Sequence, residues 1–292
     1  MENLTAIARR DFLDARRSKL VWGVFAIYGV IALLIFAGPT LVGSDVESFG
    51  VITLVSTVGL FLLPFVALVA GYLAIAGERE RGTVNFLLGL PNTRREVVLA
   101  KFLSRGALMI AATTFVFLIG IVVAVTQYAE PQLLLFVPTL AFTALLVLVM
   151  VSVAVGISAT TSSRSSAMAG AVGFYFLTIP FNLVPSVSIP GLIRYVTNDL
   201  LGFGFESDVF SFIQAAISPA MAYQQGLQVV TQRLYVEQFA PNFNDAQRTE
   251  ILERINDQAW YLMPEVMVGI LLVWLVVPLA VGYWRFRGAE LG

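Results

Sequence analysis

The side chains of this sequence that could do chemistry are its charged residues, because cysteine and histidine are both absent. Their absence excludes thiol nucleophiles, Cys/His metal sites and histidine acid–base catalysis, so neither a catalytic residue nor a metal site is expected. The densest group of charges is the run 78–81, which reads Glu-Arg-Glu-Arg, and a basic pair follows at 94–95. Charges of alternating sign favour specific contact with a partner protein over catalysis.

Composition indicates that the surrounding elements lie in a membrane. Hydrophobic residues make up 58% of the 292 residues and charged residues 13%, which is about half the share of roughly 25% found in soluble domains. Apolar stretches long enough to cross a hydrocarbon core of about 30 Å run at about 20–42, 51–76, 102–126, 133–159, 167–189 and 266–284. The sequence therefore predicts an all-α integral membrane protein with six transmembrane helices.

The predicted span interiors lack acidic and basic residues, while Arg105, Arg164 and Glu265 lie at span edges, where they can reach water. Ion-coupled transporters need buried ionisable groups, so this class is disfavoured, although transport under an ion gradient without ATP would revive it. No G-x-x-x-x-G-K-[ST] loop is present, so the chain is expected to bind no cofactor, with ATP and magnesium in a partner ATPase. The protein can line a path, but its energy must come from that partner.

Basic residues predict the orientation. If the N-terminus is cytoplasmic, the inner segments hold all but four of the 18 basic residues. Those four lie in one long outer loop, and the short outer loops 43–50 and 127–132 hold none. Both termini are therefore predicted to lie in the cytoplasm, with the protein in the cell (plasma) membrane.

The remaining segments complete the predicted organisation. Residues 1–19 are expected to form a cytoplasmic interfacial helix, although Asp11 intrudes on its apolar face. Residues 20–190 hold spans 1–5 and a cytoplasmic segment at 77–101, and residues 264–292 hold span 6 and a short cytoplasmic tail. Between them, 191–263 is expected to be a helical extracytoplasmic insertion.

Local signals refine two of these segments. Asn244 and Gln247 have the spacing of a capping box, which predicts a helix start inside the insertion. Three prolines, Pro180, Pro185 and Pro190, predict that the second half of the fifth span is broken or re-entrant.

The segment 77–101 reads GERERGTVNFLLGLPNTRREVVLAK and resembles the ABC-2 type permease family. In that family an E-x-E-x-G-T element, a pair of leucines, a proline, a basic residue and a lysine opening the third span have this spacing. The chain looks most similar to the permeases of the nitrous-oxide-reductase maturation type and their relatives. The resemblance implies the membrane subunit of an ATP-driven exporter, in which two permeases, expected to form a homodimer, pair with two ATPase subunits.

The resemblance also implies that this segment is a coupling helix seated in a cleft of the ATPase. The residues expected at that contact are Glu78, Arg79, Glu80, Arg81, Gly82, Thr83, Phe86, Leu87, Leu88, Pro91, Arg94 and Arg95. The charges would set specificity and the apolar side chains would anchor the interface.

Two smaller sets of residues have alternative interpretations. Ser163 and Arg164 could form a second ATPase contact, or a polar turn that holds the orientation. Tyr175, Thr178 and Asn182 could line a translocation path, or form hydrogen bonds between helices.

The partners expected are the ATPase, a second permease and membrane lipids, with no nucleic acid. Apolar and aromatic span interiors favour a lipid-like or amphipathic substrate. A different class of function stays open: a membrane anchor or sensor that transmits a signal from its external region. A neighbouring ATPase gene would argue against that class, and a neighbouring kinase gene would support it.

Overall fold

The computed structural model describes residues 2–16, 19–41, 48–82, 93–128, 130–184, 187–238 and 244–289, and every regular element within them is a helix. The elements are α1 (Glu2–Arg16), α2 (Lys19–Leu41), α3 (Ser48–Gly71), α4 (Ala76–Glu80), α6 (Arg94–Gln127), η1 (Leu133–Leu135), α7 (Phe136–Thr160), α8 (Arg164–Thr178), η2 (Phe181–Leu183), α9 (Ile189–Arg194), η3 (Tyr195–Leu200), α10 (Ser207–Ile217), α11 (Pro219–Gln238), α12 (Asp245–Asn256), η4 (Trp260–Leu262) and α13 (Pro264–Arg287).

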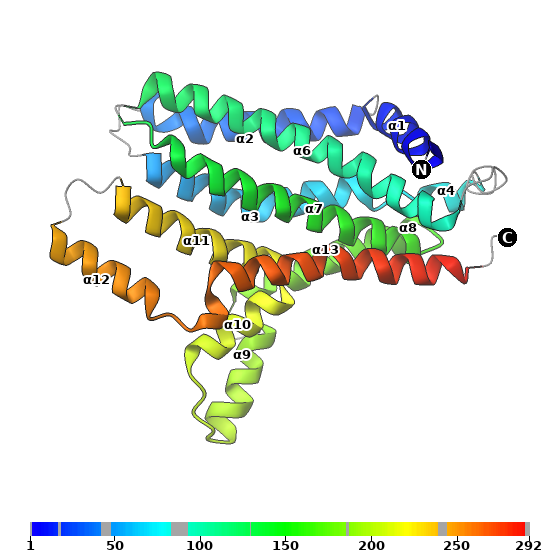
Figure 1. The fold of residues 1–292 in the computed structure, drawn as a ribbon. Helices are drawn as coiled ribbons and strands as arrows, with labels where there is room; N and C mark the ends of the chain where they lie inside the picture. Colours follow the sequence, from blue (N-terminus) through cyan, green and yellow to red (C-terminus); the bar gives the residue numbers. More distant parts are fainter. Residues whose placement is uncertain are drawn as a thin grey trace.

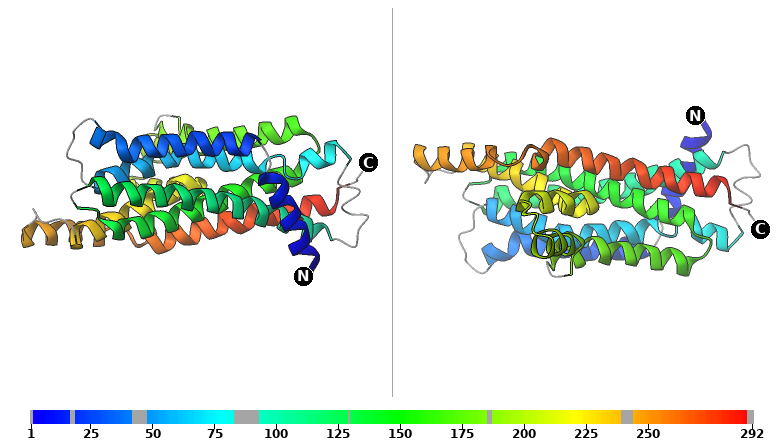
Figure 2. Two further views of the ribbon diagram at one scale, coloured as in Figure 1. Left: turned by 90° about the horizontal axis from the view of Figure 1, so that it is seen from above. Right: turned by 90° about the horizontal axis from the view of Figure 1, so that it is seen from below.

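The long helices form one elongated bundle (Figure 1). Helices α2, α3, α6, α7 and α13 run side by side, and both chain termini lie at the same end of the bundle, which we call the terminal end. The opposite end is called the distal end. Helix α1 lies across the terminal end and packs on α6 (Figure 2).

Five segments in the described part of the chain are long and apolar enough to cross a membrane: Phe49–Glu80, Arg94–Gln127, Leu133–Thr160, Arg164–Leu183 and Pro264–Arg287. They correspond to the second to sixth apolar stretches of the sequence. The first stretch forms α2, a helix of 23 residues whose side chains are described only in part. The structure thus shows an all-helical protein with five candidate spans, and a sixth span stays a prediction.

Helix α7 is the centre of the core. It contacts α3, α6, α11 and α13, and Leu146, Met150 and Val151 are fully buried. A helix that is apolar on every side is expected to be enclosed by its neighbours. Its closest neighbour is α13, because a Cβ at Gly156 would lie 2.5 Å from the carbonyl oxygen of Pro278. A small residue here allows the two backbones to touch.

The helix that contains the third apolar stretch begins at Arg94, eight residues before the predicted stretch at 102–126. The Thr93 side chain accepts a hydrogen bond from the Glu96 N–H, and the Glu96 carboxylate accepts one from the Thr93 N–H at 2.8 Å. This capping box starts the helix within polar sequence. The predicted polar segment 77–101 is therefore divided between α4, the first turns of α6 and the residues between them, of which 83–92 lie outside the described part.

The predicted break in the fifth span is confirmed. Helix α8 ends at Thr178, two residues before Pro180, and the chain continues through the short turn η2. A proline cannot supply the N–H that a continuing helix would need, and it disfavours helical geometry in the residue before it.

The segment 191–263 is helical in its described parts, and the predicted capping box at Asn244 and Gln247 is confirmed at the start of α12. Helix α11 packs against α7 and α13, so it belongs to the bundle. Helices α9, η3 and α10 instead project sideways from it (Figure 1), and Figure 2 shows this projection nearly end-on. We call residues 189–217 the lateral hairpin.

Candidate coupling site at the terminal end

Helix α4 is fastened to the last turns of α7. The buried hydroxyl oxygen of Ser158 accepts hydrogen bonds from the backbone N–H groups of Ile75 and Ala76, both at 2.9 Å. The Arg79 guanidinium donates to the Thr161 carbonyl oxygen at 2.9 Å. A displacement of α4 would therefore have to move the end of α7 or break these bonds.

The two segments that the sequence nominates for partner contact meet in the structure. The backbone N–H of Arg164 donates to Glu80 Oε2 at 2.6 Å, and its Nε lies 3.6 Å from Glu80 Oε1. Ser163 caps the start of α8, where its hydroxyl accepts from the Ser166 N–H. Glu80 and Arg164 are both exposed, so this pair forms a continuous charged surface across α4 and α8.

A buried ionic cluster joins α4 to α6 and α1. Lys101 Nζ lies 2.5 Å from Asp11 Oδ1 and 2.5 Å from Glu78 Oε1. Ser104 donates to Asp11 Oδ2, and Arg105 Nε lies 3.4 Å from the same oxygen. These five residues, which we call the ionic cluster, connect α1, the Glu-Arg-Glu-Arg run and the first turns of α6.

Two opposing influences, burial and neighbouring positive charge, act on the pKa of Asp11 in the ionic cluster. Burial alone would raise the pKa of the Asp11 carboxyl, because it disfavours the charged form. The charges of Lys101 and Arg105, with hydrogen bonds from Lys101 and Ser104, outweigh burial and hold this pKa below its ordinary value. The carboxylate is therefore ionised at neutral pH and paired with buried cations.

Asp11 and Lys101 are the residues that sequence reasoning failed to place in the site. Their signals were present: Asp11 stands on an apolar helix face, and Lys101 is one of only two lysines. Lys101, Ser104 and Arg105 also have the spacing that places residues on one face of a helix. What the sequence could not supply was the partner, because these residues are about ninety positions from Asp11.

The other predicted contact residues have varied surroundings. Arg94 donates to the carbonyl oxygens of Phe286, Arg287 and Ala289 and lies over the Phe286 ring, so it holds the end of α13. Arg95 and Arg81 are exposed, and Gly82 has a φ of +71°, a conformation that favours glycine. Thr83, Phe86, Leu87, Leu88 and Pro91 lie outside the described residues.

The residues nominated for a translocation path form hydrogen bonds around the break in the fifth span. Tyr175 Oη donates to the Phe61 carbonyl oxygen at 3.3 Å, which links α8 to α3. Thr178 donates to the Phe174 carbonyl, and its own carbonyl accepts from Asn182 Nδ2 at 3.1 Å and from the Ser218 hydroxyl. These contacts match the alternative interpretation, in which such residues join helices, and a role in a path stays a prediction.

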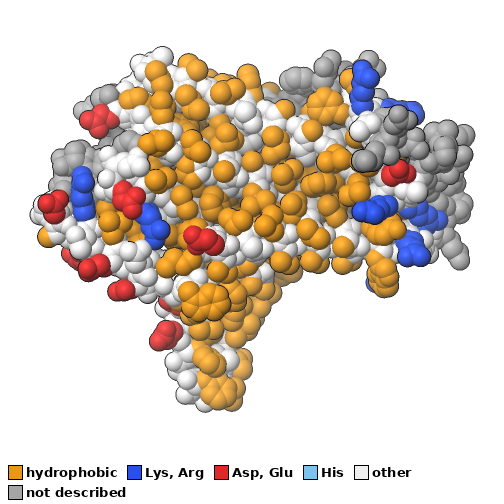
Figure 3. All heavy atoms as spheres, in the orientation of Figure 1, with side chains coloured by type: hydrophobic (Ala, Val, Ile, Leu, Met, Phe, Trp, Pro, Cys, Tyr) orange, Lys and Arg blue, Asp and Glu red, His pale blue; other side chains and the backbone are white. Residues whose placement is uncertain are grey.

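The two ends of the molecule differ in the sign of most of their charged side chains (Figure 3). In this view lysine and arginine gather at the terminal end, and most acidic side chains lie towards the distal end, around α12. Between them the visible surface is mainly hydrophobic. Among the described residues, no group of three or more acidic side chains is arranged to hold a metal ion.

Apolar helices of spanning length, with charged groups concentrated at the two ends, define a multi-pass membrane protein. Its sequence matches the family described as ABC-2 family transporter protein over residues 5–291, and the chain belongs to that family.

Two curated relatives are similar to parts of the chain. The chain is 29% identical, over 184 residues, to a probable ABC transporter permease protein NosY of Pseudomonas aeruginosa; the match covers 59% of this chain and 66% of the relative. It is 30% identical over 115 residues to the protein of the same description from Stutzerimonas stutzeri, which covers 38% of this chain and 42% of the relative. The matches thus span only part of each relative's length.

Proposed function

We propose that this chain is the membrane-spanning permease subunit of an ATP-driven ABC exporter, and that a separate ATPase binds it at the terminal end. The observation that carries the proposal is the hydrogen bond and ion pair between Glu80 of α4 and Arg164 of α8. It places both nominated contact segments on one charged surface, at the end where basic residues gather. Membership of the ABC-2 family, and the relatives described as ABC transporter permeases, support the same role.

The hydrogen bonds of α4 offer a route for force. An ATPase that pushes on 78–82 would act on α6 and α1 through Lys101, on α7 through Ser158, and on α8 through Arg164. Helices α6, α7 and α8 bond directly to α4, and α1 is reached through Lys101, so all four would receive the displacement. This arrangement suits a subunit that converts the motion of a partner into a motion of its spans.

The finer features follow from the same proposal. Helix α2 is a further span, the first in chain order, which brings the total to six. Both termini are cytoplasmic, and two copies of the chain pair with two ATPase subunits. The substrate is lipid-like or amphipathic, since the spans are built almost entirely of apolar and aromatic residues.

The test is co-purification from native membranes. The tagged chain is expected to bring down an ATP-hydrolysing partner, identified by mass spectrometry. The double variant Glu80→Gln with Arg164→Gln is expected to lower the recovered ATPase activity severalfold. The matched control is Glu250→Gln with Arg254→Gln, which removes an exposed ion pair of the same kind from α12. Equal ATPase recovery from both double variants and the unaltered chain would contradict the coupling surface.

The second candidate, a sensor or anchor, is favoured by one feature: α12 and the lateral hairpin extend away from the bundle (Figure 1). A sensor would co-purify with a kinase or another signalling protein and with no ATPase. Recovery of an ATPase alone would exclude this candidate.

A further inference from the structure

We propose that the lateral hairpin lies in the outer layer of the membrane and that the cavity within it binds the headgroup of a zwitterionic phospholipid. The inference requires that the bundle spans a membrane, and the assignment to the outer layer rests on the cytoplasmic position of the termini given under the proposed function. It is independent of the ATPase, and its test can fail while the coupling proposal survives.

The depth of the hairpin follows from α13. Exposed tryptophans lie near both ends of this helix, with Trp260 just before it and Trp284 near its end. From Pro264 to Trp284 the helix rises about 30 Å, which matches the thickness of a hydrocarbon core. Tryptophan is enriched at both membrane interfaces, so Trp260 marks the interface towards the distal end.

The hairpin is attached at that level. The Phe212 ring of α10 packs edge-to-face on Tyr261, with centroids 5.5 Å apart. Further along α10, the Ala216 carbonyl oxygen accepts a hydrogen bond from Trp274 Nε1 at 2.9 Å. Trp274 is ten residues into α13, about 15 Å along its axis. The two attachment points are four residues apart, about 6 Å along α10, so the base of the hairpin lies at and just inside the interface that Trp260 marks. Its helices extend sideways from the bundle at that level (Figure 1).

The outer surface of the hairpin is apolar. Leu200 and Phe203 at its tip are 66% and 63% exposed, and Leu201 and Phe205 are exposed as well. The tip is nevertheless ordered by its own bonds: the Asn198 side chain donates to the Phe205 carbonyl and accepts from its N–H, at 2.8 and 2.9 Å. Figure 3 shows this surface continuing into the apolar side of the bundle. Acyl chains are the natural neighbours of such a continuous surface.

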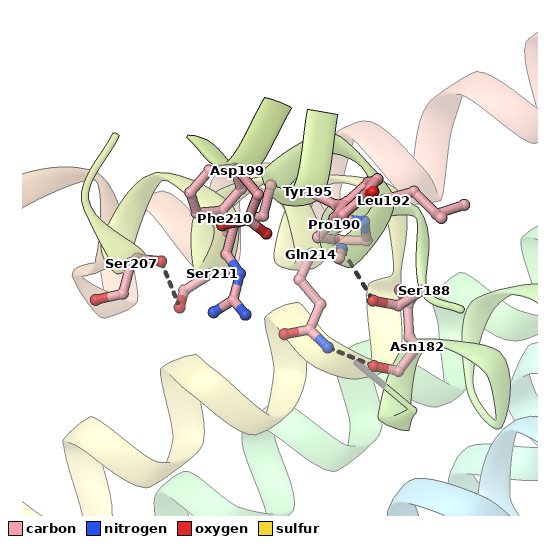
Figure 4. A pocket seen from close by; sticks show the side chains of 12 residues that line it. Asn182, Ser188, Pro190, Leu192, Tyr195, Asp199, Ser207, Phe210, Ser211 and Gln214 are labelled. Carbon is pink, nitrogen blue, oxygen red and sulfur yellow. Dashed lines mark hydrogen bonds between the residues drawn. The ribbon is translucent and has the colours of Figure 1, made fainter. Parts of the chain in front are cut away.

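The inner side of the hairpin is different, because it holds a cavity of about 740 Å³ in which polar and charged side chains stand among apolar ones such as Leu192, Tyr195 and Phe210 (Figure 4). This volume is within the range of roughly 300–1,000 Å³ for small-molecule sites. Polar residues from α9, η3, α10 and the break after α8 line it: Asn182, Ser188, Arg194, Asp199, Ser211 and Gln214. Gln214 Nε2 donates to the Asn182 carbonyl oxygen at 2.7 Å, which fixes α10 to the chain after the break.

Arg194 and Asp199, the two charged residues that line the cavity, indicate which ligand it would bind. Arg194 is the one basic residue in the sequence between Arg164 and Arg233, and among the described residues no ion pair joins it to an acidic side chain. A guanidinium binds a phosphate through two parallel hydrogen bonds. Asp199 lines the same cavity and carries the opposite charge. One cation and one anion match a phosphodiester with an amine, as in phosphatidylethanolamine, whose acyl chains would follow the apolar outer face.

The experiment is a lipid titration of the purified full chain in detergent, followed by native mass spectrometry. Palmitoyl-oleoyl-phosphatidylethanolamine is expected to bind more tightly than the phosphatidylglycerol with the same chains. Arg194→Gln is expected to weaken phosphatidylethanolamine binding about tenfold, and Asp199→Asn to remove the preference between the two lipids. Arg254→Gln, an exposed arginine on α12, is the matched control and is expected to change neither.

Three outcomes would overturn the proposal: unchanged phosphatidylethanolamine binding by Arg194→Gln, a preference of the unaltered chain for phosphatidylglycerol, or displacement of the lipid by equal concentrations of inorganic phosphate. The last would show an anion site without lipid specificity. If Arg194→Gln fails to fold, Arg194→Lys keeps the charge without the paired geometry and is expected to bind with intermediate affinity.

Discussion

The terminal end and the lateral hairpin place their charged residues in opposite ways: Asp11 and Lys101 are buried, whereas Arg194 and Asp199 are exposed. At the terminal end, Asp11, Lys101 and Glu78 turn inward and bond three helices together. On the hairpin, Leu200 and Phe203 turn outward, and the polar side chains line a cavity. The first arrangement makes a rigid joint that can transmit force between helices. The second arrangement gives a surface suited to lipid. Both regions contain charged residues, and they differ in whether those residues are buried.

The largest effect is expected from Lys101→Met, which would leave the carboxylates of Asp11 and Glu78 without their shared cation. Removing one partner of a buried ionic group costs about 3–5 kcal/mol, and the side chains of Lys101 and Asp11 are only 4% and 8% exposed. The free energy of unfolding in detergent, followed by tryptophan fluorescence, should fall by about this amount. Adding Asp11→Asn should restore part of the loss, and a destabilisation below about 1 kcal/mol would show that the joint is weak.

The second-largest loss of stability is expected where α7 packs on α13, in the bundle between the two regions. Gly156→Val would place side-chain atoms against the Pro278 backbone, where even a Cβ would lie 2.5 Å from the carbonyl oxygen. Overpacking of this kind costs about 1–3 kcal/mol. Gly173→Val in α8 is the matched control, because a Cβ there meets no described atom within 4 Å. Equal unfolding free energies for the two variants would argue against close packing of α7 on α13.

Strong acid should weaken the terminal end, because Asp11 then loses the charge that pairs it with Lys101. The folded-state pKa of Asp11 is lowered, so its contribution to stability is complete above the ordinary value of 3.8 and is lost as pH falls through the folded value. Between pH 7 and 5 this contribution should stay constant, and below pH 3.8 it should decline. Comparison of the unaltered chain with Asp11→Asn in a pH series isolates the effect, and parallel curves for the two proteins would contradict it.

The smallest effect is expected at the hairpin. Phe203→Ser should change the free energy of unfolding in detergent by less than about 0.5 kcal/mol, as exposed positions generally do, because this ring is 63% exposed. A larger loss would mean that the hairpin tip is part of the packed structure.

Much of the fold could be predicted from the sequence, because apolar stretches of spanning length have few alternatives to a helix in lipid. The break before Pro180 and the capping box at Asn244 were likewise visible as local patterns. The start of α6 was missed because hydropathy alone set the boundary, although Thr93 and Glu96 have capping-box spacing.

The site was harder to predict for a physical reason. The pairing of Asp11 with Lys101 depends on how α1 crosses α6, and that crossing is a property of tertiary packing. The pairing of Glu80 with Arg164 also joins residues far apart in sequence. Local patterns could nominate Glu80, Arg164 and the Glu-Arg-Glu-Arg run, but they could not show which side chains face inward and which remain available to a partner.

The most direct test of the central claim, that the partner ATPase binds at the terminal end, uses the absence of cysteine from the chain. A single cysteine is introduced either at the exposed Arg81 in the terminal region or at the exposed Ala246 in α12, and each protein is treated with a bifunctional thiol–amine cross-linker in native membranes. If the ATPase binds at the terminal end, it is cross-linked with Arg81→Cys and not with Ala246→Cys. An ATPase captured through Ala246→Cys, with none captured through Arg81→Cys, would contradict the claim.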